Sequence, residues 1–188
     1  MSAQPFDPPF DPASEVLRTE RLDLLPLSLE FCRAVLAGDR SLASRLFGYE
    51  IGAWPEGDEL RAAFPHYVNV LTLRPDLAGW HGRAIVVRDS GTVAGSVNLK
   101  GRPRNGRAEV GYGLLEAYRG RGYAREAARA AVARAFLDVA TAEVVAVIDP
   151  SNAASIRVAE SLGMRRTGEL SSEHPGSYVW LVAREAWA

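Results

Sequence analysis

Short runs of apolar residues, in part alternating with polar ones, predict several strands in the first two thirds of the chain. The first run, residues 21–25, ends at Pro26. Residues 84–88 and 93–99 flank an Asp-Ser-Gly turn and predict a β-hairpin. Residues 107–115 would extend this hairpin, so we expect a meander in the middle of the chain.

The strand at 107–115 has two different faces, because successive side chains of a strand point to opposite sides of the sheet. The residues divide into Val110, Tyr112 and Leu114 on one face and Glu109, Gly111 and Gly113 on the other. Two glycines on one face leave space above the strand. We therefore expect that face to be open for a ligand.

Helical spacing of apolar residues appears in three segments, residues 29–37, 124–139 and 153–162. The first and third follow Ser28 and Asn152, which belong to the residue types that cap helix N-termini. A glycine follows each of these two helices, as is common at helix C-termini. The second segment is rich in alanine, which has the highest helix propensity.

The remaining segments complete the predicted fold. Residues 144–148 are a continuous apolar run, typical of a strand that is covered on both faces and parallel to its neighbour. Residues 178–182 predict a last strand, and residues 40–80 contain two helices or one helix kinked at Pro65. The element order predicts an α/β protein of the α+β kind, with a central mixed, mostly antiparallel sheet flanked by helices.

Length and composition indicate one compact domain. A chain of 188 residues can bury a substantial core. We expect the domain to cover residues 15–188, since four prolines in residues 1–14 predict a disordered tail. The apolar runs are far shorter than the roughly 20 residues of a membrane span, and no signal peptide is visible. The sequence therefore predicts a cytoplasmic protein.

Charge and cysteine content exclude several classes of function. With 22 basic and 23 acidic residues the net charge is −1, which gives no reason to expect a nucleic-acid or membrane partner. Cys32 is the single cysteine, so a disulfide framework is excluded. The three histidines have no ligand spacing, and we expect no metal site.

Residues 119–124 carry the main chemical signal of the chain. Gly120 and Gly122 let backbone N–H groups converge just before the alanine-rich helix, whose N-terminus adds partial positive charge. Arg119, Arg121 and Arg125 add fixed charge, so the segment suits a pyrophosphate without a metal ion. It is not a nucleotide P-loop, which needs a Gly-Lys-Ser/Thr ending. The fingerprint of dinucleotide-binding proteins also fails, because Arg125 occupies the third glycine position.

The segment Arg-Gly-Arg-Gly-Tyr-Ala at 119–124 resembles the Arg/Gln-x-x-Gly-x-Gly/Ala signature of the GNAT superfamily of N-acetyltransferases. Residues 109–113 and 152–164 resemble the neighbouring motifs of that family. Residues 19–22, Thr-Glu-Arg-Leu, resemble the opening strand of its RimJ/RimL-like branch, so the similarity extends over about residues 15–183. The resemblance implies a GNAT-like fold.

The resemblance also implies an activity, the transfer of an acetyl group from acetyl-CoA to an amine, as in the EC 2.3.1 acyltransferases. Acetyl-CoA would be a co-substrate, with no metal. The residues implied to bind it are Tyr112, Gly113, Leu114, Arg119, Gly120, Arg121, Gly122, Tyr123, Ala124 and Asn152. Asn152 would touch the CoA arm near the thiol while also capping its helix.

Two side chains are candidates for proton transfer. Glu109 either acts as general base on the acceptor ammonium or is a solvated strand carboxylate. Ser155 either protonates the leaving thiolate or is only part of the first helical turn. Cys32 has no recognisable partner, so we expect direct attack by the amine in a ternary complex. Backbone N–H groups near 112–115 would polarise the thioester carbonyl if the strand carries a bulge there.

The acceptor stays open at this level. An N-terminal α-amine, with a pKa of about 8, needs less help from a base than lysine at about 10.4. A small-molecule amine is the alternative, and a non-catalytic acyl-CoA-binding domain is the rival class. Trp54, Trp80 and His81 flank the region expected to form the acceptor pocket, although loop packing explains them better. The acidic residues at 50–59 either favour a cationic substrate or form a solvated helix start. The protein could be a monomer or a homodimer.

Overall fold

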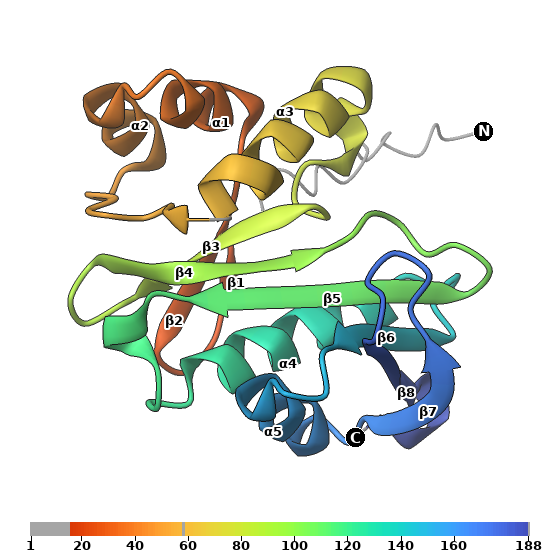
Figure 1. Ribbon diagram of the computed structural model, residues 1–188. Coiled ribbons are helices and arrows are strands. Elements are labelled where there is room, and N and C mark those ends of the chain that lie inside the picture. Colours follow the sequence, from red (N-terminus) through yellow and green to blue (C-terminus); the bar gives the residue numbers. More distant parts are fainter. Residues whose placement is uncertain (1–15, 58, 188) are drawn as a thin grey trace, which may run out of the picture.

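The computed structural model describes residues 16–57 and 59–187, and the tail predicted at 1–14 lies outside these ranges. Its centre is an eight-stranded sheet with the order β1-β2-β3-β4-β5-β6-β8-β7. Helices α1, α2 and α3 lie on one side of the sheet, and α4 and α5 lie on the other (Figure 1). In the described residues, no helix has the length and apolar character needed to span a membrane.

The strands are β1 (Leu17–Arg18), β2 (Leu22–Pro26), β3 (Gly82–Val87), β4 (Thr92–Leu99), β5 (Arg107–Leu114), β6 (Glu143–Ile148), β7 (Arg165–Leu170) and β8 (Tyr178–Ala183). The helices are α1 (Leu29–Leu36), α2 (Arg40–Phe47), α3 (Phe64–Leu73), α4 (Tyr123–Phe136) and α5 (Ala153–Ser161). A π-helical turn, Glu59–Ala63, leads directly into α3. The predicted mixed, mostly antiparallel sheet is confirmed.

The one parallel pair among the described strands is β5–β6, which confirms the prediction for the run at 144–148. These two strands pair only over Arg107–Glu109 and Glu143–Val145. Beyond that point β5 continues along β4, while β6 pairs with β8 instead. The sheet therefore opens into a fork between β5 and β6.

Strands β1 and β7 were not expected from the sequence. β7 has the sequence Arg-Arg-Thr-Gly-Glu-Leu, is mostly exposed and pairs only with β8. An edge strand of this kind has no apolar face and so no hydrophobic alternation. Region 40–80 contains helix α2 and a second helical stretch, in which the π-helical turn runs into α3. Pro65 lies just after the π-helical turn, and its ring lacks the N–H of the helical ladder.

Two hydrophobic cores lie on the two sides of the sheet. The alanine core packs α4 against the sheet through small side chains, namely Ala127, Ala128, Ala131, Val132 and Ala135. The aromatic core packs α1–α3 against the other face and contains Phe31, Phe47, Trp54, Phe64 and Tyr67. Small residues let α4 approach the strands closely, whereas large rings fill a wider space under α1–α3.

Candidate functional site

The fork between β5 and β6 opens into a cavity of about 610 Å³. The end of β5, the turn before α4, the first turn of α4 and one face along the whole of α5 surround it. The lining residues are Tyr112, Gly113, Leu114, Arg119, Gly120, Gly122, Tyr123, Ala124, Arg125, Asn152, Ala154, Ser155, Arg157, Val158 and Ser161. Ten of the twelve predicted site residues are therefore brought together here, and Arg121 and Glu109 are not.

The turn before α4 has the backbone that the sequence predicts. Gly120 and Gly122 have φ values of 75° and 80°, in the left-handed region that favours glycine. A Cβ atom at Gly120 would meet nothing within 4 Å, so the turn presents bare backbone to the cavity. Gly122 is the N-cap of α4 and supplies no capping side chain, which leaves N–H groups of the first turn open to an anion.

Three arginines, Arg119, Arg125 and Arg157, contribute positive charge to the cavity. Arg119 also supports the turn, because its Nε donates to the carbonyl of Leu114 at 3.1 Å. Arg121 is directed elsewhere, and its guanidinium lies 5.9 Å from the ring centre of Tyr118. Among the described residues, no group of three or more His, Cys, Asp or Glu side chains could hold a metal ion.

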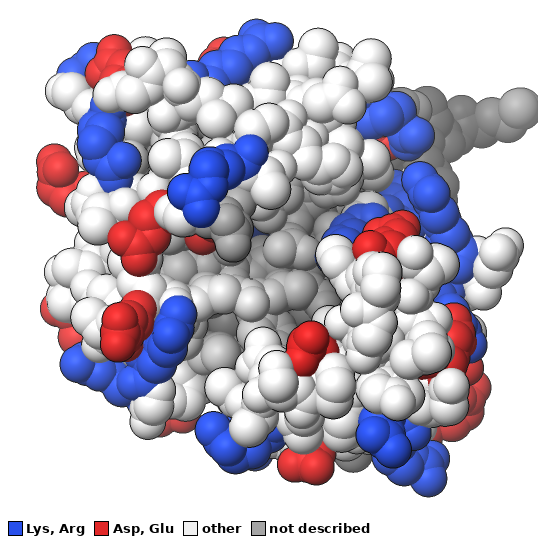
Figure 2. Space-filling model, viewed as in Figure 1, with Lys and Arg blue, Asp and Glu red and all other residues white. Residues whose placement is uncertain are grey.

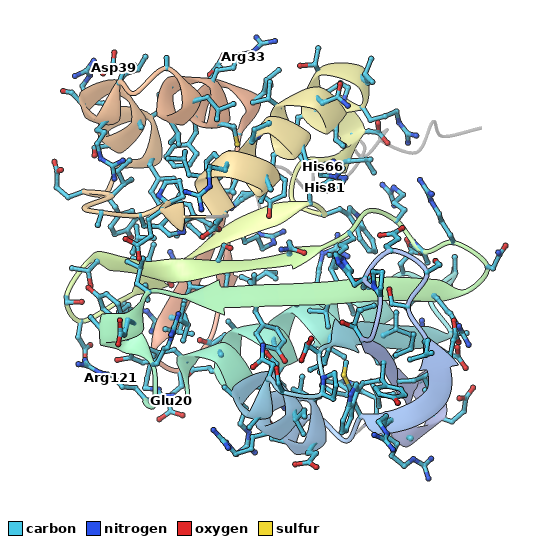
Figure 3. All side chains as sticks on the ribbon, in the orientation of Figure 1. Glu20, Arg33, Asp39, His66, His81 and Arg121 are labelled. Atoms are coloured by element: carbon cyan, nitrogen blue, oxygen red, sulfur yellow. The ribbon has the colours of Figure 1, made fainter. Side chains whose placement is uncertain are left out.

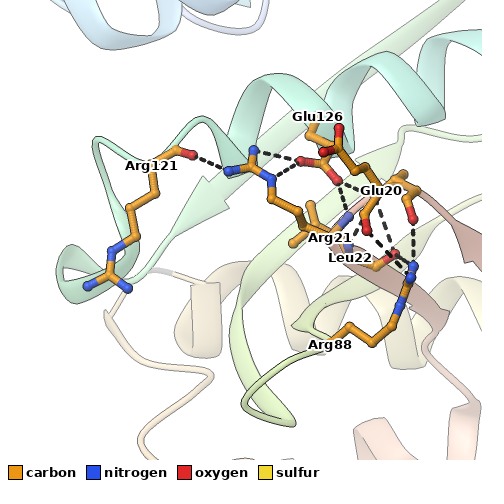
Figure 4. A network of polar contacts seen from close by, with 7 residues as sticks. Glu20, Arg21, Leu22, Arg88, Arg121 and Glu126 are labelled. Carbon is orange, nitrogen blue, oxygen red and sulfur yellow. Dashed lines mark hydrogen bonds and ion pairs between the residues drawn. The ribbon is translucent and has the colours of Figure 1, made fainter.

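The backbone of Arg121 is nevertheless part of the support of the turn. Its carbonyl accepts a hydrogen bond from Nη1 of Arg21 at 2.9 Å, which joins the start of β2 to the turn (Figure 4). In Figure 3, Arg121 and Glu20 lie at the same end of the molecule. The guanidinium of Arg21 also lies 4.9 Å from the ring centre of Tyr123, the first residue of α4.

Glu126 in α4 is the centre of this network. It accepts hydrogen bonds from Thr19 Oγ1 at 2.5 Å, from the amide of Arg21 at 2.8 Å and from Arg21 Nε at 2.7 Å. Burial acts to raise the pKa of Glu126, but the bonds from Thr19 and Arg21 outweigh it and hold the pKa below its ordinary value. The residues Thr-Glu-Arg-Leu at 19–22 thus have a structural purpose, which is to brace the turn.

The helix α5 forms the other wall of the cavity. Asn152 caps α5, because its Oδ1 accepts the amide hydrogen of Ser155 at 3.0 Å, and the same residue lines the cavity. The two interpretations of Asn152 are therefore compatible. The hydroxyl of Tyr112 donates to the carbonyl of Ser155 at 3.2 Å. Burial raises the pKa of Tyr112 to about 12, although the side chain of Ser155 acts to lower it.

Backbone amides of β5 face the fork without any bulge. The Glu109 carbonyl bonds to Lys100 and the Leu115 amide bonds to Ala94, so these odd-numbered residues direct their polar groups toward β4. Alternation then points the amides of Tyr112 and Leu114 toward the fork. The register of β5 on β4 is unbroken from Val110 to Leu114. A bulge at 112–115, considered from the sequence, is therefore absent; the irregularity lies between β3 and β4.

Glu109 lies at the closed end of the fork, at the last β5 residue paired with β6. Its carboxylate forms an ion pair with Lys100, and its side chain is 23% exposed. Gly113 is four positions further along the strand, or about 13 Å away. The structure therefore does not bring Glu109 to the cavity lining, and its role as base stays a prediction.

A second carboxylate, Glu59, lies on the side of the sheet that carries α1–α3. Its Oε2 accepts from the indole Nε1 of Trp54 at 2.9 Å, and its Oε1 accepts from the hydroxyl of Ser96. Ser96 is directly opposite Gly113 in the β4–β5 ladder. Burial raises the pKa of Glu59, an effect that the bonds from Ser96 and Trp54 partly offset. The sequence did not single out Glu59 among the acidic residues at 50–59. No local pattern indicates that Ser96 and Trp54 would be its hydrogen-bond partners.

The aromatic and histidine residues considered for an acceptor pocket are buried: Trp54 and Trp80 lie in the two cores, and His81 is 6% exposed. The His66 and His81 rings point toward one another, with centres 5.6 Å apart (Figure 3). Burial and, to a smaller extent, the proximity of His66 lower the pKa of His81 to about 4. These residues serve packing, as the sequence favoured.

The sequence also missed part of α5. Ala154, Val158 and Ser161 line the cavity at the spacing i, i+4, i+7, which is one stripe of a helix. Arg157 lies beside this stripe. Helical periodicity counted from the Asn152 cap could have identified the stripe, whereas nothing local indicated Arg157.

Comparison with known proteins agrees with this geometry. The chain matches the family described as "Acetyltransferase (GNAT) domain" over residues 21–165. It is 48% identical over 56 residues to the uncharacterized protein YkkB of Bacillus subtilis, covering 30% of this chain and 33% of that protein. The chain spans between 33% and 64% of the length of the curated relatives it matches first.

Among solved structures, an acetyltransferase from Agrobacterium tumefaciens is similar over 98% of this chain and 99% of its own, with 26% identity and a TM-score of 0.64. A RimL ribosomal L7/L12 alpha-N-protein acetyltransferase in complex with coenzyme A has 17% identity and a TM-score of 0.61, over 92% of this chain and 99% of its own. The RimL likeness concerns the fold alone. With a family match that covers most of its length, the chain belongs to the GNAT acetyltransferases.

Proposed function

We propose that this chain moves an acetyl group from acetyl-CoA to an amine, which attacks the thioester directly in a ternary complex. The observation that carries the proposal is the cavity at the β5–β6 fork. Two left-handed glycines, an uncapped helix N-terminus and three arginines surround it. A pyrophosphate fits such a cavity, because the backbone N–H groups are not covered by side chains and the arginines supply fixed positive charge.

The residues proposed to hold acetyl-CoA follow the cavity from the turn to the fork. The turn and the start of α4 would bind the pyrophosphate, through Arg119, Gly120, Gly122, Tyr123 and Ala124. The amides of Tyr112 and Leu114 would bind the extended CoA arm, beside Gly113. Asn152 and Ser155 would lie near the thiol, where the Ser155 hydroxyl is the candidate acid. The backbone of Arg121 supports the turn rather than the ligand.

For the acceptor we propose the N-terminal amine of a protein or peptide. Its pKa of about 8 leaves a useful fraction unprotonated near neutral pH. The RimL structure, that of an alpha-N-protein acetyltransferase, is consistent with this choice through the shared fold. We also propose that the protein acts in the cytoplasm, where its buried Cys32 would stay reduced.

The test is a screen for acetyl-CoA-dependent thiol release. Three sets of amines are compared: peptides with a free N-terminus, N-acetylated peptides that contain lysine, and polyamines or aminoglycosides. We expect release with the first set. Release with only the third set would make the protein a small-molecule acetyltransferase.

Binding is measured separately by thermal unfolding. Acetyl-CoA at about 100 times its Kd should stabilise the fold by about 2.7 kcal/mol. For a chain of this length that is a rise in Tm on the order of 5–11 °C. A rise in Tm without thiol release from any amine would indicate a non-catalytic acyl-CoA-binding domain, and no rise would contradict the cavity assignment.

A further inference from the structure

The site described so far binds one substrate, and the opposite side of the same strand pair carries the features of a site for the other. We propose that the Glu59 carboxylate receives the proton of the acceptor ammonium above Gly113, beside a polar wall formed by Ser96, Asn98 and Tyr67. This inference rests on the proposed function, because it names the base and the acceptor subsite of that reaction.

The position of Glu59 follows from the register of the sheet. Ser96 donates to Glu59 and is directly opposite Gly113, where side-chain positions of neighbouring strands are roughly 5 Å apart. Gly113 itself lines the acetyl-CoA cavity, and a Cβ atom there would meet nothing within 4 Å. A group above Gly113 can therefore reach both the carboxylate and the cavity. The space-filling view shows this face hollowed at its middle, between α1–α3 and α4–α5 (Figure 2).

The carboxylate is held in place by the aromatic core. Trp54 is fully buried and directs its indole N–H at Glu59 Oε2, 2.9 Å away. Glu59 is also the first residue of the π-helical turn before α3, a kind of irregularity that is frequent at functional sites. Glu59 remains half-buried rather than buried, so a substrate can reach it.

The electrostatics suit a proton acceptor. Burial raises the pKa of Glu59, which makes the carboxylate a stronger base than an ordinary glutamate. Titratable groups of this region include Tyr67 of α3, which interacts electrostatically with Glu59, and Cys32 of α1, which interacts with Tyr67. Burial raises the pKa of both, so neither carries charge near neutral pH. On the strand side, Ser96 and Asn98 are uncharged.

The two glycines of β5 form the floor of this subsite. Asn98 lies opposite Gly111 and donates through Nδ2 to the hydroxyl of Tyr67 at 3.3 Å. A Cβ atom at Gly111 would come within 2.9 Å of Asn98 Oδ1. Larger residues at 111 or 113 would thus displace the polar wall or fill the space above it. The open face that the sequence predicts is, in this proposal, the acceptor side.

The reaction balances with Glu59 as the first proton acceptor. The ammonium loses one proton to Glu59, and the free amine forms an N–C bond to the thioester carbonyl carbon. The C–S bond then breaks, the second amine proton goes to the sulfur, and the products are an amide and a thiol. Glu59 returns its proton to water. Glu109, in contrast, has its charge matched by Lys100 at the closed end of the fork.

The experiment compares three single-substitution variants with the wild type. The acceptor substrate is a peptide that carries a free N-terminus. Glu59→Gln should lower kcat/KM at pH 7 by roughly 10²–10⁴-fold and leave the Kd of acetyl-CoA unchanged within about twofold. The loss should shrink as the pH rises above 8, because the α-amine then deprotonates without help. Glu109→Gln tests the competing base, and Glu56→Gln is the matched control with an exposed carboxylate.

A positioning variant separates chemistry from structure. Ser96→Ala removes a hydrogen bond that lowers the pKa of Glu59, so the acid limb of the pH–rate profile should move to higher pH. Turnover of Glu59→Gln within twofold of wild type, or a large loss confined to Glu109→Gln, would overturn the proposal. If wild type releases no thiol with any amine while acetyl-CoA still raises the Tm, the proposed function itself fails.

Discussion

The two sides of the sheet are built in different ways. On the side of α4 and α5, the cavity is built around one turn, whose left-handed glycines, helix N-terminus and two arginines, Arg119 and Arg125, follow one another within a few residues. On the side of α1–α3, Glu59, Ser96, Asn98 and Tyr67 come from three separate elements. The first side is a local structure, and the second exists only after the aromatic core has formed.

This difference suggests how the two sides tolerate change. The acetyl-CoA side depends on glycines for which few substitutes exist. The acceptor side depends on side chains held by packing, so a change in the aromatic core should move the base and alter acceptor use before it alters acetyl-CoA binding. The predictions that follow test that separation, from the largest expected effect to the smallest.

The strongest test of two separate cores is a pair of core substitutions. Phe31→Ala removes a ring that lies 4.8 Å from Phe47 and 6.0 Å from Trp54, between ring centres, and should cost about 3–5 kcal/mol of unfolding free energy. Ala131→Leu overpacks the alanine core and should cost about 1–3 kcal/mol. Urea unfolding measures both, and the double variant should show additive losses within about 0.5 kcal/mol. Strong non-additivity would mean that the cores act as one.

The next test removes the acetyl-CoA side alone. In Gly122→Leu the side chain would enter the turn at a φ of 80°, and its Cβ would lie 3.3 Å from Arg21 Nη2. We expect the Kd of acetyl-CoA to rise by at least about 100-fold, or about 2.7 kcal/mol, as measured by calorimetry. Gly38→Leu is the matched control, with a φ of 75° after α1 and away from the cavity. Equal effects on affinity would show that the turn is not the binding site.

A smaller effect should come from the brace of the turn. Arg21→Met removes the bond to the Arg121 carbonyl and the ion pair with Glu126, in which Nη2 and Oε2 are 2.6 Å apart. The loosened turn should bind acetyl-CoA about tenfold more weakly, since hydrogen bonds of charged groups contribute about 1.5–3 kcal/mol each before solvent screening. Arg88→Met, which loses bonds only to the Thr19, Glu20 and Leu22 carbonyls and the Asp23 carboxylate, should lower stability and spare affinity.

The smallest predicted effect is a pH dependence of stability on the acceptor side. His81 has a folded pKa of about 4, below its ordinary value of 6.5, because the folded protein resists its protonation. Its contribution to stability is complete above pH 6.5 and is lost as the pH falls toward 4. We expect His81→Leu to remove on the order of 1–2 kcal/mol from the stability difference between pH 7 and pH 4.5. An unchanged pH dependence would show that the pKa of His81 does not differ between the folded and unfolded states.

The turn that lines the cavity could be predicted from the sequence because its signals are local. The glycines at 120 and 122, the N-cap Asn152 and the start of α4 can each be recognised from a few consecutive residues. The structure contains all of them. The sheet was predictable for a similar reason, except for the two-residue strand β1 and for β7, which lacks an apolar face. Backbone alternation, not a bulge, turns the β5 amides to the fork, and this becomes evident only with the register known.

The acceptor side could not be predicted, because its contacts join distant parts of the chain. Glu59 and Ser96 are 37 positions apart, and Asn98 and Tyr67 are 31 apart. In the sequence, Glu59 looks like a solvated helix start, and only the burial around Trp54 gives it partners. Glu109 drew attention for the opposite reason, because it lies within a recognisable motif, yet its carboxylate pairs with Lys100.

The bond between Arg21 and the Arg121 carbonyl joins residues 100 positions apart, and this has a consequence for dynamics. The residues between β1 and β2 cannot complete their contacts until the start of α4 has also folded. Ligand binding and the opening of residues 19–22 are then coupled, since the Arg21 and Leu22 amides bond to Glu126 and Thr19. Acetyl-CoA should therefore slow hydrogen exchange at these two amides, far in the sequence from the residues that would touch its phosphates.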